Sequence, residues 1–197
     1  MEGIELIRLH GAALSPYLDQ LGQLRISVFA DYPYLYEGSL EYEKEYLKVY
    51  LREPESLTVG LVQDGKWIGA TTAIPLKAET KAIQKPFLEA GIPIDDVFYF
   101  GESVLLPNYR GRGFGHLFFD ERERFAQEKG YSLTAFCSVI RPDDHPLKPA
   151  GYRSNEAFWT KRGYTQRSDL RCHMSWLDKG ETLETEKQLE FWIKEWK

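Results

Sequence analysis

The stretch VLLPNYRGRGFGH, residues 104–116, decides how the rest of the chain is interpreted. An apolar run ends at Pro107, and three glycines and two arginines follow within the six residues 110–115, before an amphipathic helical pattern begins. The first N–H groups of a helix have no partner within it, and the helix dipole adds partial positive charge there. Because glycines let an anion approach the backbone closely, the turn predicts a phosphate site, and a pyrophosphate site in particular.

Two well-known phosphate loops do not fit this turn. The Walker loop needs Gly-Lys-Ser/Thr, whereas Gly115 is followed by His116 and Leu117. The dinucleotide fingerprint G-x-G-x-x-G fails as well, because counting from Gly111 puts His116 at the position of the third glycine. Taken alone, the stretch also permits a strand–helix turn without any ligand.

Composition limits the classes of protein that remain. The 197 residues suit one domain, 1–197, and 43% hydrophobic with 14% aromatic residues is ample for a packed core. A net charge of −5 without long runs of like charge argues against nucleic acid or a membrane surface as partner. The N-terminus lacks the pattern of a secretory signal, and the two cysteines are far apart, so we expect a cytoplasmic protein with reduced thiols.

Hydrophobic periodicity predicts alternating helices and strands. Strands are expected at 4–9, 57–62, 67–76, 97–106, 131–140 and 170–177, with a hairpin turn at Asp64-Gly65. Helices are expected near 14–28, 40–50, 79–90, 114–130, 155–161 and 183–196. This order indicates an α/β or α+β sandwich built on a mixed sheet.

The pattern V-x-x-P-x-x-R-G-x-G-x-G, from Val104 to Gly115, resembles the acyl-CoA signature of the GNAT superfamily of N-acyltransferases. The core of that signature is Q/R-x-x-G-x-G/A, matched here by Arg110, Gly113 and Gly115. The order of elements is similar over most of the chain. The resemblance implies a mixed, mostly antiparallel central sheet with helices on both faces, with helix 183–196 as an elaboration. It also implies acetyl-CoA as cofactor and direct attack of an amine on the thioester.

The resemblance further implies that the loop N–H groups hold the CoA pyrophosphate and that the strand end at Leu105 and Leu106 binds the pantetheine arm. The predicted cofactor-binding residues are Leu105, Leu106, Arg110, Gly111, Arg112, Gly113, Phe114, Gly115, His116, Asn155 and Trp159. Trp159 stands where the family usually has a tyrosine that protonates the departing thiolate. Because an indole N–H is far too weak an acid for that step, Tyr152 is the predicted substitute.

Glu102 is the predicted catalytic base. Strict strand alternation would place it on one face with Phe98, Phe100 and Val104, in apolar surroundings that suit proton abstraction near neutral pH. Several GNAT enzymes carry a glutamate at this place before the loop. The alternatives are a glutamate on an open sheet surface or one paired with an arginine.

The acceptor is predicted to meet the loop FADYPYLYEG, residues 29–38. Phe29, Tyr34, Tyr36 and Glu37 would form an aromatic, acidic pocket that suits an ammonium group, although they could equally be core aromatics with a surface glutamate. His145 is a further predicted substrate contact. Its Asp-Asp-His surroundings have poor ligand spacing, so no metal is expected.

The leading functional prediction is an N-acetyltransferase that acts on the amine of a small molecule. A protein or peptide amine is the alternative within that class. A catalytically silent acyl-CoA-binding module is the alternative outside it, because of Trp159, and a nucleotide-phosphate binder outside the family is a third. The tryptophan-rich C-terminal segment could pack on its own sheet or form a homodimer.

Overall fold

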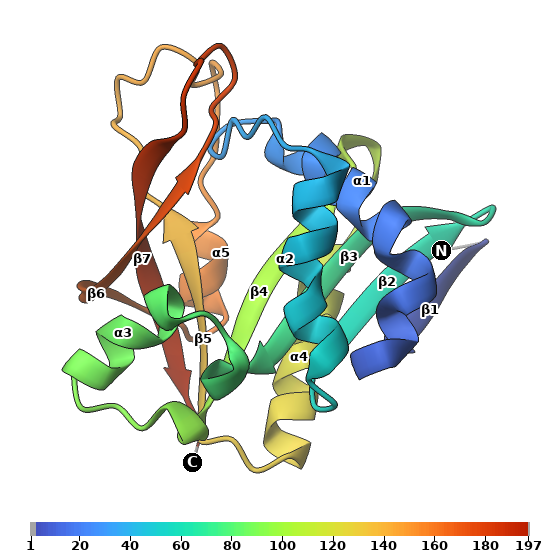
Figure 1. The fold of residues 1–197 in the computed structure, drawn as a ribbon, viewed down its shortest axis with the longest axis vertical. Coiled ribbons are helices and arrows are strands. Elements are labelled where there is room, and N and C mark those ends of the chain that lie inside the picture. The colour runs from blue at the N-terminus through green and yellow to red at the C-terminus, as the bar shows by residue number, and fades with distance from the viewer. Residues whose placement is uncertain (1–2, 197) are drawn as a thin grey trace.

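The computed structural model describes residues 3–196, which form one seven-stranded sheet in the order β1-β2-β3-β4-β5-β7-β6 (Figure 1). The strands are β1 (Ile4–Leu9), β2 (Leu57–Gln63), β3 (Lys66–Pro75), β4 (Val97–Leu105), β5 (Leu133–Val139), β6 (Thr165–Trp176) and β7 (Thr185–Glu195). Within this sheet β4 and β5 are parallel and the other neighbouring strands are antiparallel. The predicted mixed, mostly antiparallel α/β fold is confirmed.

Helices cover both faces of the sheet. The α-helices are α1 (Leu18–Phe29), α2 (Leu40–Arg52), α3 (Lys81–Glu89), α4 (Phe114–Glu128) and α5 (Glu156–Lys161), and a 3₁₀ segment, Gly11–Tyr17, precedes α1. Side chains of α1, α2 and α3 share one buried cluster, and those of α4 and α5 share another on the opposite face. None of the helices between residues 3 and 196 has both the length and the apolar composition needed to cross a bilayer.

The β2–β3 hairpin confirms the turn predicted at Asp64-Gly65. Both residues adopt positive φ, 49° and 73°, as a tight two-residue hairpin turn requires. A glycine and an aspartate tolerate this region better than most residues, which is why the dipeptide is a strong local signal.

The predicted C-terminal helix 183–196 is wrong, because these residues contain strand β7, which lies between β5 and β6. Leu189, Phe191 and Ile193 face the α3 side of the sheet, and Trp192 faces the α4 side. A strand buried on both faces carries apolar residues at consecutive positions, so its sequence does not show a clean period of two.

Two irregularities of β4 shape the middle of the sheet. The strand pairs with β5 only from Val97 to Tyr99, and beyond that point the two strands separate. On its other side, the register with β3 shifts between the pairs Ala73–Phe100 and Thr71–Ser103, so β4 contains one extra residue, as in a β-bulge. A space therefore opens beside residues 100–105.

Glu121 on α4 ties that helix to the edge strand β1. Its carboxylate accepts two hydrogen bonds from Arg8, at 2.6 and 2.7 Å, and one from Arg124 at 2.7 Å. The hydrogen bonds from Arg8 hold the pKa of Glu121 below its ordinary value, against the opposing effect of partial burial. The ion pair of Glu121 with Arg8 therefore stabilises the folded protein fully at a pH above the ordinary carboxyl pKa. This stabilisation is lost as the pH falls through the lower pKa that Glu121 has in the folded protein.

We expect Glu121→Gln to lower the free energy of unfolding at pH 7 by about 1 kcal/mol, a modest amount because Arg8 is partly exposed to solvent. Urea unfolding of the wild-type protein and of Glu121→Gln at pH 7 and at pH 3 measures the difference in their free energies of unfolding. This difference should be smaller at pH 3 than at pH 7. An equal difference at both pH values would show that the ion pair is not its cause.

Candidate functional site

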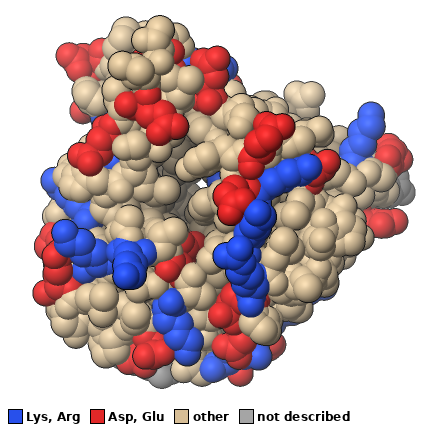
Figure 2. Space-filling view, in the orientation of Figure 1, with Lys and Arg blue, Asp and Glu red and all other residues tan. Residues whose placement is uncertain are grey.

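A cavity of about 750 Å³ lies where β4 and β5 separate. It is lined by the ends of both strands, the segment from Val28 to Tyr34, the first turns of α4, and the segment from Pro149 to Trp159. Figure 2 shows a hollow near the centre of the corresponding face, and acidic and basic side chains are mixed around it without a broad basic patch. The cavity joins the predicted cofactor turn to the predicted acceptor loop.

The glycine turn opens onto this cavity through Gly115. Within residues 3–196, no protein group accepts a hydrogen bond from the main-chain N–H groups of residues 111–116. Gly111 and Gly113 have φ of 74° and 86°, which an L side chain rarely adopts, and Gly113 is the N-cap of α4. A Cβ added at either glycine would meet no atom within 4 Å. The turn thus offers free donors and open space at a helix N-terminus, which fits a phosphate group.

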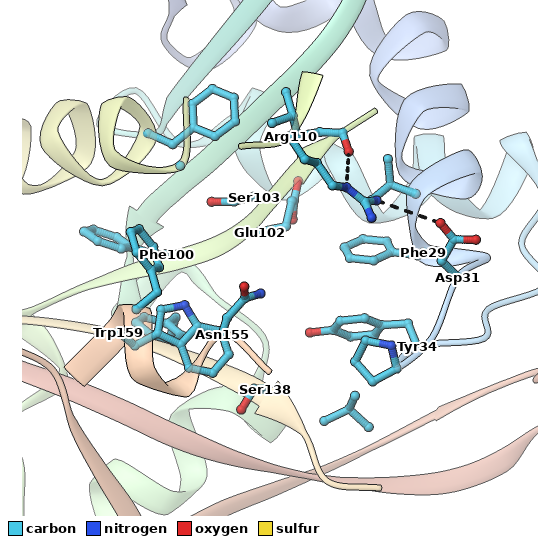
Figure 3. A pocket seen from close by; sticks show the side chains of 18 of the residues that line it. Phe29, Asp31, Tyr34, Phe100, Glu102, Ser103, Arg110, Ser138, Asn155 and Trp159 are labelled. Atoms are coloured by element: carbon cyan, nitrogen blue, oxygen red, sulfur yellow. Dashed lines mark hydrogen bonds and ion pairs between the residues drawn. The ribbon is translucent and has the colours of Figure 1, made fainter. Parts of the chain in front are cut away.

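The two arginines of the turn do not point the same way. Arg110 lines the cavity, where its Nε donates to the carbonyl oxygen of Leu105 at 3.1 Å and its Nη2 lies 3.8 Å from Asp31 (Figure 3). Arg112 is exposed and stacks on Tyr109, with 5.3 Å between guanidinium carbon and ring centre. Arg110 therefore spans the cleft between the predicted cofactor side and acceptor side.

The remaining predicted cofactor residues differ in what they present. Leu105, Asn155 and Trp159 line the cavity. The N–H of Leu106 already donates to the carbonyl of Ile68 at 3.0 Å, so it is not free for a pantetheine arm. Phe114 is buried in a core cluster, and the ring of His116 packs on Phe158 at 4.9 Å. Phe114 and His116 can thus contribute to an anion site through the main chain.

The β-bulge sets the position of Glu102. Its carbonyl oxygen accepts hydrogen bonds from the Thr71 hydroxyl at 2.7 Å and from Arg122 Nη1 at 3.3 Å. Phe98 and Phe100 face α4, but after the extra residue the Glu102 side chain faces α1. The prediction that Glu102 shares a face with both phenylalanines is therefore wrong, because the bulge reverses the alternation.

The Glu102 carboxylate lines the cavity and is nearly buried, 7% exposed. It forms an ion pair with Arg25 of α1, so the predicted apolar surroundings are wrong and the arginine-paired alternative holds. Oxygen Oε1 of Glu102 has no hydrogen-bond partner among the described residues. A buried acceptor without a partner is costly, so this atom is well placed to bind an N–H group entering the cavity.

Arg122 is a buried cation behind the bulge. It is 2% exposed and stacks on Phe100 and Phe119, at 4.2 and 4.8 Å from the ring centres. Loss of hydration lowers the pKa of Arg122 to about 10, so the guanidinium stays charged at neutral pH. Arg122 holds the carbonyl group of Glu102 in place. The sequence did not predict this role of Arg122, because the contact depends on the β-bulge.

Tyr34 lies on the predicted acceptor side, and its hydroxyl points into the cavity (Figure 3). Phe29 lines the same wall, with its ring centre 4.7 Å from that of Tyr34. Burial raises the pKa of Tyr34 above its ordinary value, with a further contribution from Cys137, so the hydroxyl is protonated at neutral pH.

The loop that carries Tyr34 is fixed by residues that the sequence did not single out. Arg141 donates to the carbonyls of Pro33 and Tyr34, at 2.8 and 2.7 Å, and makes a double hydrogen bond with Asp178. The indole N–H of Trp176 also donates to the Tyr34 carbonyl, at 3.0 Å. This contact joins segments that are remote in the chain, so no local pattern could have found it.

Three of the predicted residues, Tyr36, Glu37 and His145, do not line the main cavity, whereas Tyr152 does. Tyr36 and Glu37 line a second hollow of about 470 Å³, together with Tyr42 and Leu183, and they do not line the main cavity. Tyr152 lines the main cavity, with its ring centre 4.7 Å from that of Tyr32. His145 does not line the cavity, and its ring centre is 5.7 Å from that of Tyr32.

Trp159 lines the cavity as part of an aromatic wall. Its ring centre is 5.0 Å from that of Phe136 and 5.2 Å from that of Trp192.

Over the described part of the chain, no group of three or more His, Cys, Asp or Glu side chains is arranged to hold a metal ion.

The parallel strands β4 and β5 separate beside the glycine-rich turn that begins α4. The fold is that of the GNAT acyl-CoA N-acyltransferases. An acetyltransferase from Streptococcus agalactiae is similar over 100% of both chains, with a TM-score of 0.64 and 14% identity. Ribosomal-protein-alanine N-acetyltransferase from Brucella melitensis matches 96% of this chain and 99% of its own, with a TM-score of 0.61 and 13% identity.

The yncA protein of Salmonella typhimurium, solved with its cofactor acetyl-CoA, matches 98% of this chain and 94% of its own, with a TM-score of 0.59 and 7% identity. No protein-family model matches the sequence, and the search of curated proteins finds no relative. At these identities the likeness establishes the fold.

Proposed function

We propose that this protein is an N-acetyltransferase that moves the acetyl group of acetyl-CoA to the amine of a small molecule. The observation that carries the proposal is a single cavity with free main-chain donors at one end and a buried carboxylate, Glu102, within it. The GNAT fold supports acyl transfer as the reaction class. The Salmonella protein with acetyl-CoA supports the choice of donor.

In this proposal the turn 110–116 holds the pyrophosphate of acetyl-CoA through its main-chain N–H groups, and Arg110 adds a guanidinium at the edge of the cavity. The bound thioester supplies the activated acetyl group. Asn155 and Trp159 form the opposite wall. The fixed backbone donors need no rearrangement when the anion arrives, which is what makes such a site effective.

Glu102 removes a proton from the attacking amine. An alkylammonium with a pKa of about 10.4 must give up a proton before it can attack, at a cost of roughly 4 to 5 kcal/mol at pH 7. Glu102 lines the cavity, and its Oε1 has no hydrogen-bond partner among the described residues, so the carboxylate can accept that proton. The ion pair with Arg25 keeps the carboxylate in place.

Tyr34 donates a proton to the departing thiolate in this proposal. Its hydroxyl points into the cavity (Figure 3), whereas the predicted donor Tyr152, which also lines the cavity, packs edge-on against the ring of Tyr32. Trp159, at the position where a tyrosine is usual, carries only an indole N–H. A donor from the acceptor loop would therefore replace one from α5.

We expect Tyr34→Phe to lower kcat roughly 10- to 100-fold with little change in KM for acetyl-CoA, because only the proton is removed. Steady-state kinetics of CoA release measures both constants. Tyr131→Phe is the matched control, because the Tyr131 hydroxyl donates a hydrogen bond to Glu55 outside the cavity. A loss in Tyr152→Phe without one in Tyr34→Phe would assign the donor role to Tyr152 instead.

The acceptor loop supports a small molecule over a protein chain. Arg141, Asp178 and Trp176 hold the loop against the end of the sheet, and Phe29 and Tyr34 form an aromatic wall of the cavity. Such a wall suits an ammonium group by cation–π attraction. A protein amine remains the second candidate because the similar Brucella protein is named for a ribosomal protein.

Release of CoA from acetyl-CoA, measured with panels of small amines and of peptides with free N-termini, tests the proposal. Turnover with small amines is the expected result. Tight acetyl-CoA binding without turnover of any amine would indicate the silent binding module. Thermal stabilisation by ATP or NAD, but not by CoA, would indicate a nucleotide binder.

A further inference from the structure

A buried group of three charged side chains lies between α1, α2 and β4. Arg25 of α1 donates through Nε to Glu43 of α2 and pairs through Nη1 with Glu102 of β4. Arg25 and Glu102 are each 7% exposed, and Glu43 is fully buried. One guanidinium thus links a carboxylate that lines the cavity to one that does not.

Aromatic rings fix the guanidinium of Arg25 from the sides. Its central carbon lies 4.3 Å from the ring centre of Tyr46 and 5.1 Å from that of Phe29. Burial alone would lower the pKa of Arg25, but the nearby Glu102, Tyr46 and Glu43 outweigh it and raise the pKa. Arg25 is therefore a permanent cation in a fixed position.

We propose that Arg25 and Glu43 are positioning residues that orient the Glu102 carboxylate and set how readily it takes up a proton. The inference rests on the proposed function, in which Glu102 is the base. Arg25 donates its Nε hydrogen bond to Glu43 and not to Glu102. The negative charge of Glu43 also offsets part of the positive charge of Arg25. Two carboxylates therefore share one guanidinium, and only one of them lines the cavity.

Other groups also face Glu102, and they must be considered for any pH effect. They are Tyr46 and Tyr50 of α2, Tyr34 of the acceptor loop, Glu79 after β3, and Arg122 of α4. Burial raises the pKa values of Tyr34, Tyr46, Tyr50 and Glu79, so these groups tend toward their neutral forms. Arg122 is charged but binds the carbonyl of Glu102. Arg25 and Glu43 are thus the charged side chains joined in one ion-pair chain with the Glu102 carboxylate.

The signs of the two substitutions are opposite. Glu43→Gln removes a negative charge and leaves Arg25 to Glu102, so the ionised form of Glu102 becomes more stable and protonation shifts to lower pH. Arg25→Met removes the cation, so protonation of Glu102 shifts to higher pH. The shift in Arg25→Met should be about one pH unit or more, since an opposite charge in direct contact has effects of that size. The shift in Glu43→Gln should be smaller, because Glu43 acts on Glu102 through Arg25. A role limited to packing would not produce opposite shifts.

Two readouts test the inference. The first is the acidic limb of the kcat/KM profile for the amine, measured from pH 5 to pH 9. The second is independent of activity and follows the Glu102 carboxyl resonance by carbon-13 NMR in protein labelled at glutamate Cδ, assigned through Glu102→Gln. Glu121→Gln, the same substitution outside the cavity, is the control and should move neither readout.

Opposite displacements in Glu43→Gln and Arg25→Met are expected in both readouts. If Arg25→Met does not fold, the shift to lower pH in Glu43→Gln supports the inference by itself. Shifts in the same direction, or no shift in Glu43→Gln, would overturn it. If the wild-type protein shows no turnover, the proposed function fails, while the NMR titration still decides whether Arg25 and Glu43 control Glu102.

Discussion

Replacing Glu102 with glutamine is expected to lower kcat at pH 7 by roughly 100- to 1,000-fold, the usual range for loss of a general base. The amide keeps the shape of the side chain but cannot accept the proton of the attacking amine. KM for acetyl-CoA should change little, because the free N–H donors of the turn belong to residues 111–116.

The pH dependence of this variant provides a stricter test. Without a base, the rate depends on the fraction of neutral amine, which rises about tenfold per pH unit below the amine pKa. The deficit of Glu102→Gln should therefore shrink as the pH rises from 7 to 10. Glu121→Gln removes a carboxylate outside the cavity and should keep wild-type kcat. A Glu102→Gln enzyme as fast as wild type at pH 7 would remove Glu102 from the mechanism.

Gly115→Glu is expected to weaken acetyl-CoA binding by at least about tenfold, or 1.4 kcal/mol. Gly115 lies in the first turn of α4 without a positive φ, and an added Cβ would meet only Phe158, at an ordinary contact distance of 3.6 Å. The folded protein therefore tolerates the side chain, because glutamate is a better helix former than glycine and a negative charge is favourable at a helix N-terminus. The same carboxylate would repel a phosphate and compete with it for the N–H groups.

Calorimetric titration and thermal melting together separate these effects. The melting temperature of Gly115→Glu should equal or exceed that of the wild type, while Kd for acetyl-CoA rises. Gln127→Ala, an exposed position on the same helix, should change neither quantity appreciably. Unchanged acetyl-CoA affinity in Gly115→Glu would show that the phosphates bind elsewhere.

The glycine turn and its flanking strand and helix were predictable because their signal is local. The apolar run before Pro107, the glycines and the amphipathic helix after Gly113 follow one another in sequence, and the structure places β4, the turn and α4 in that order. The hairpin at Asp64-Gly65 was predictable for the same reason.

The surroundings of Glu102 were not predictable, because they depend on partners remote in sequence. The bulge that reverses its direction exists only in the pairing with β3, and Arg25 and Glu43 come from two helices at the other end of the chain. Strand β7 was mistaken for a helix because both of its faces are buried. Periodicity reports burial on one face and fails where two faces are covered.

In our proposal the turn 110–116 binds the pyrophosphate of CoA beside the separated strands β4 and β5. Calorimetric titration of the wild-type protein with CoA, pantetheine and ATP tests this binding mode. We expect CoA to bind, pantetheine to bind at least about tenfold more weakly because it lacks the pyrophosphate, and ATP to bind more weakly than CoA. Equal affinities for CoA and pantetheine, or no binding of CoA, would show that the turn does not hold the pyrophosphate.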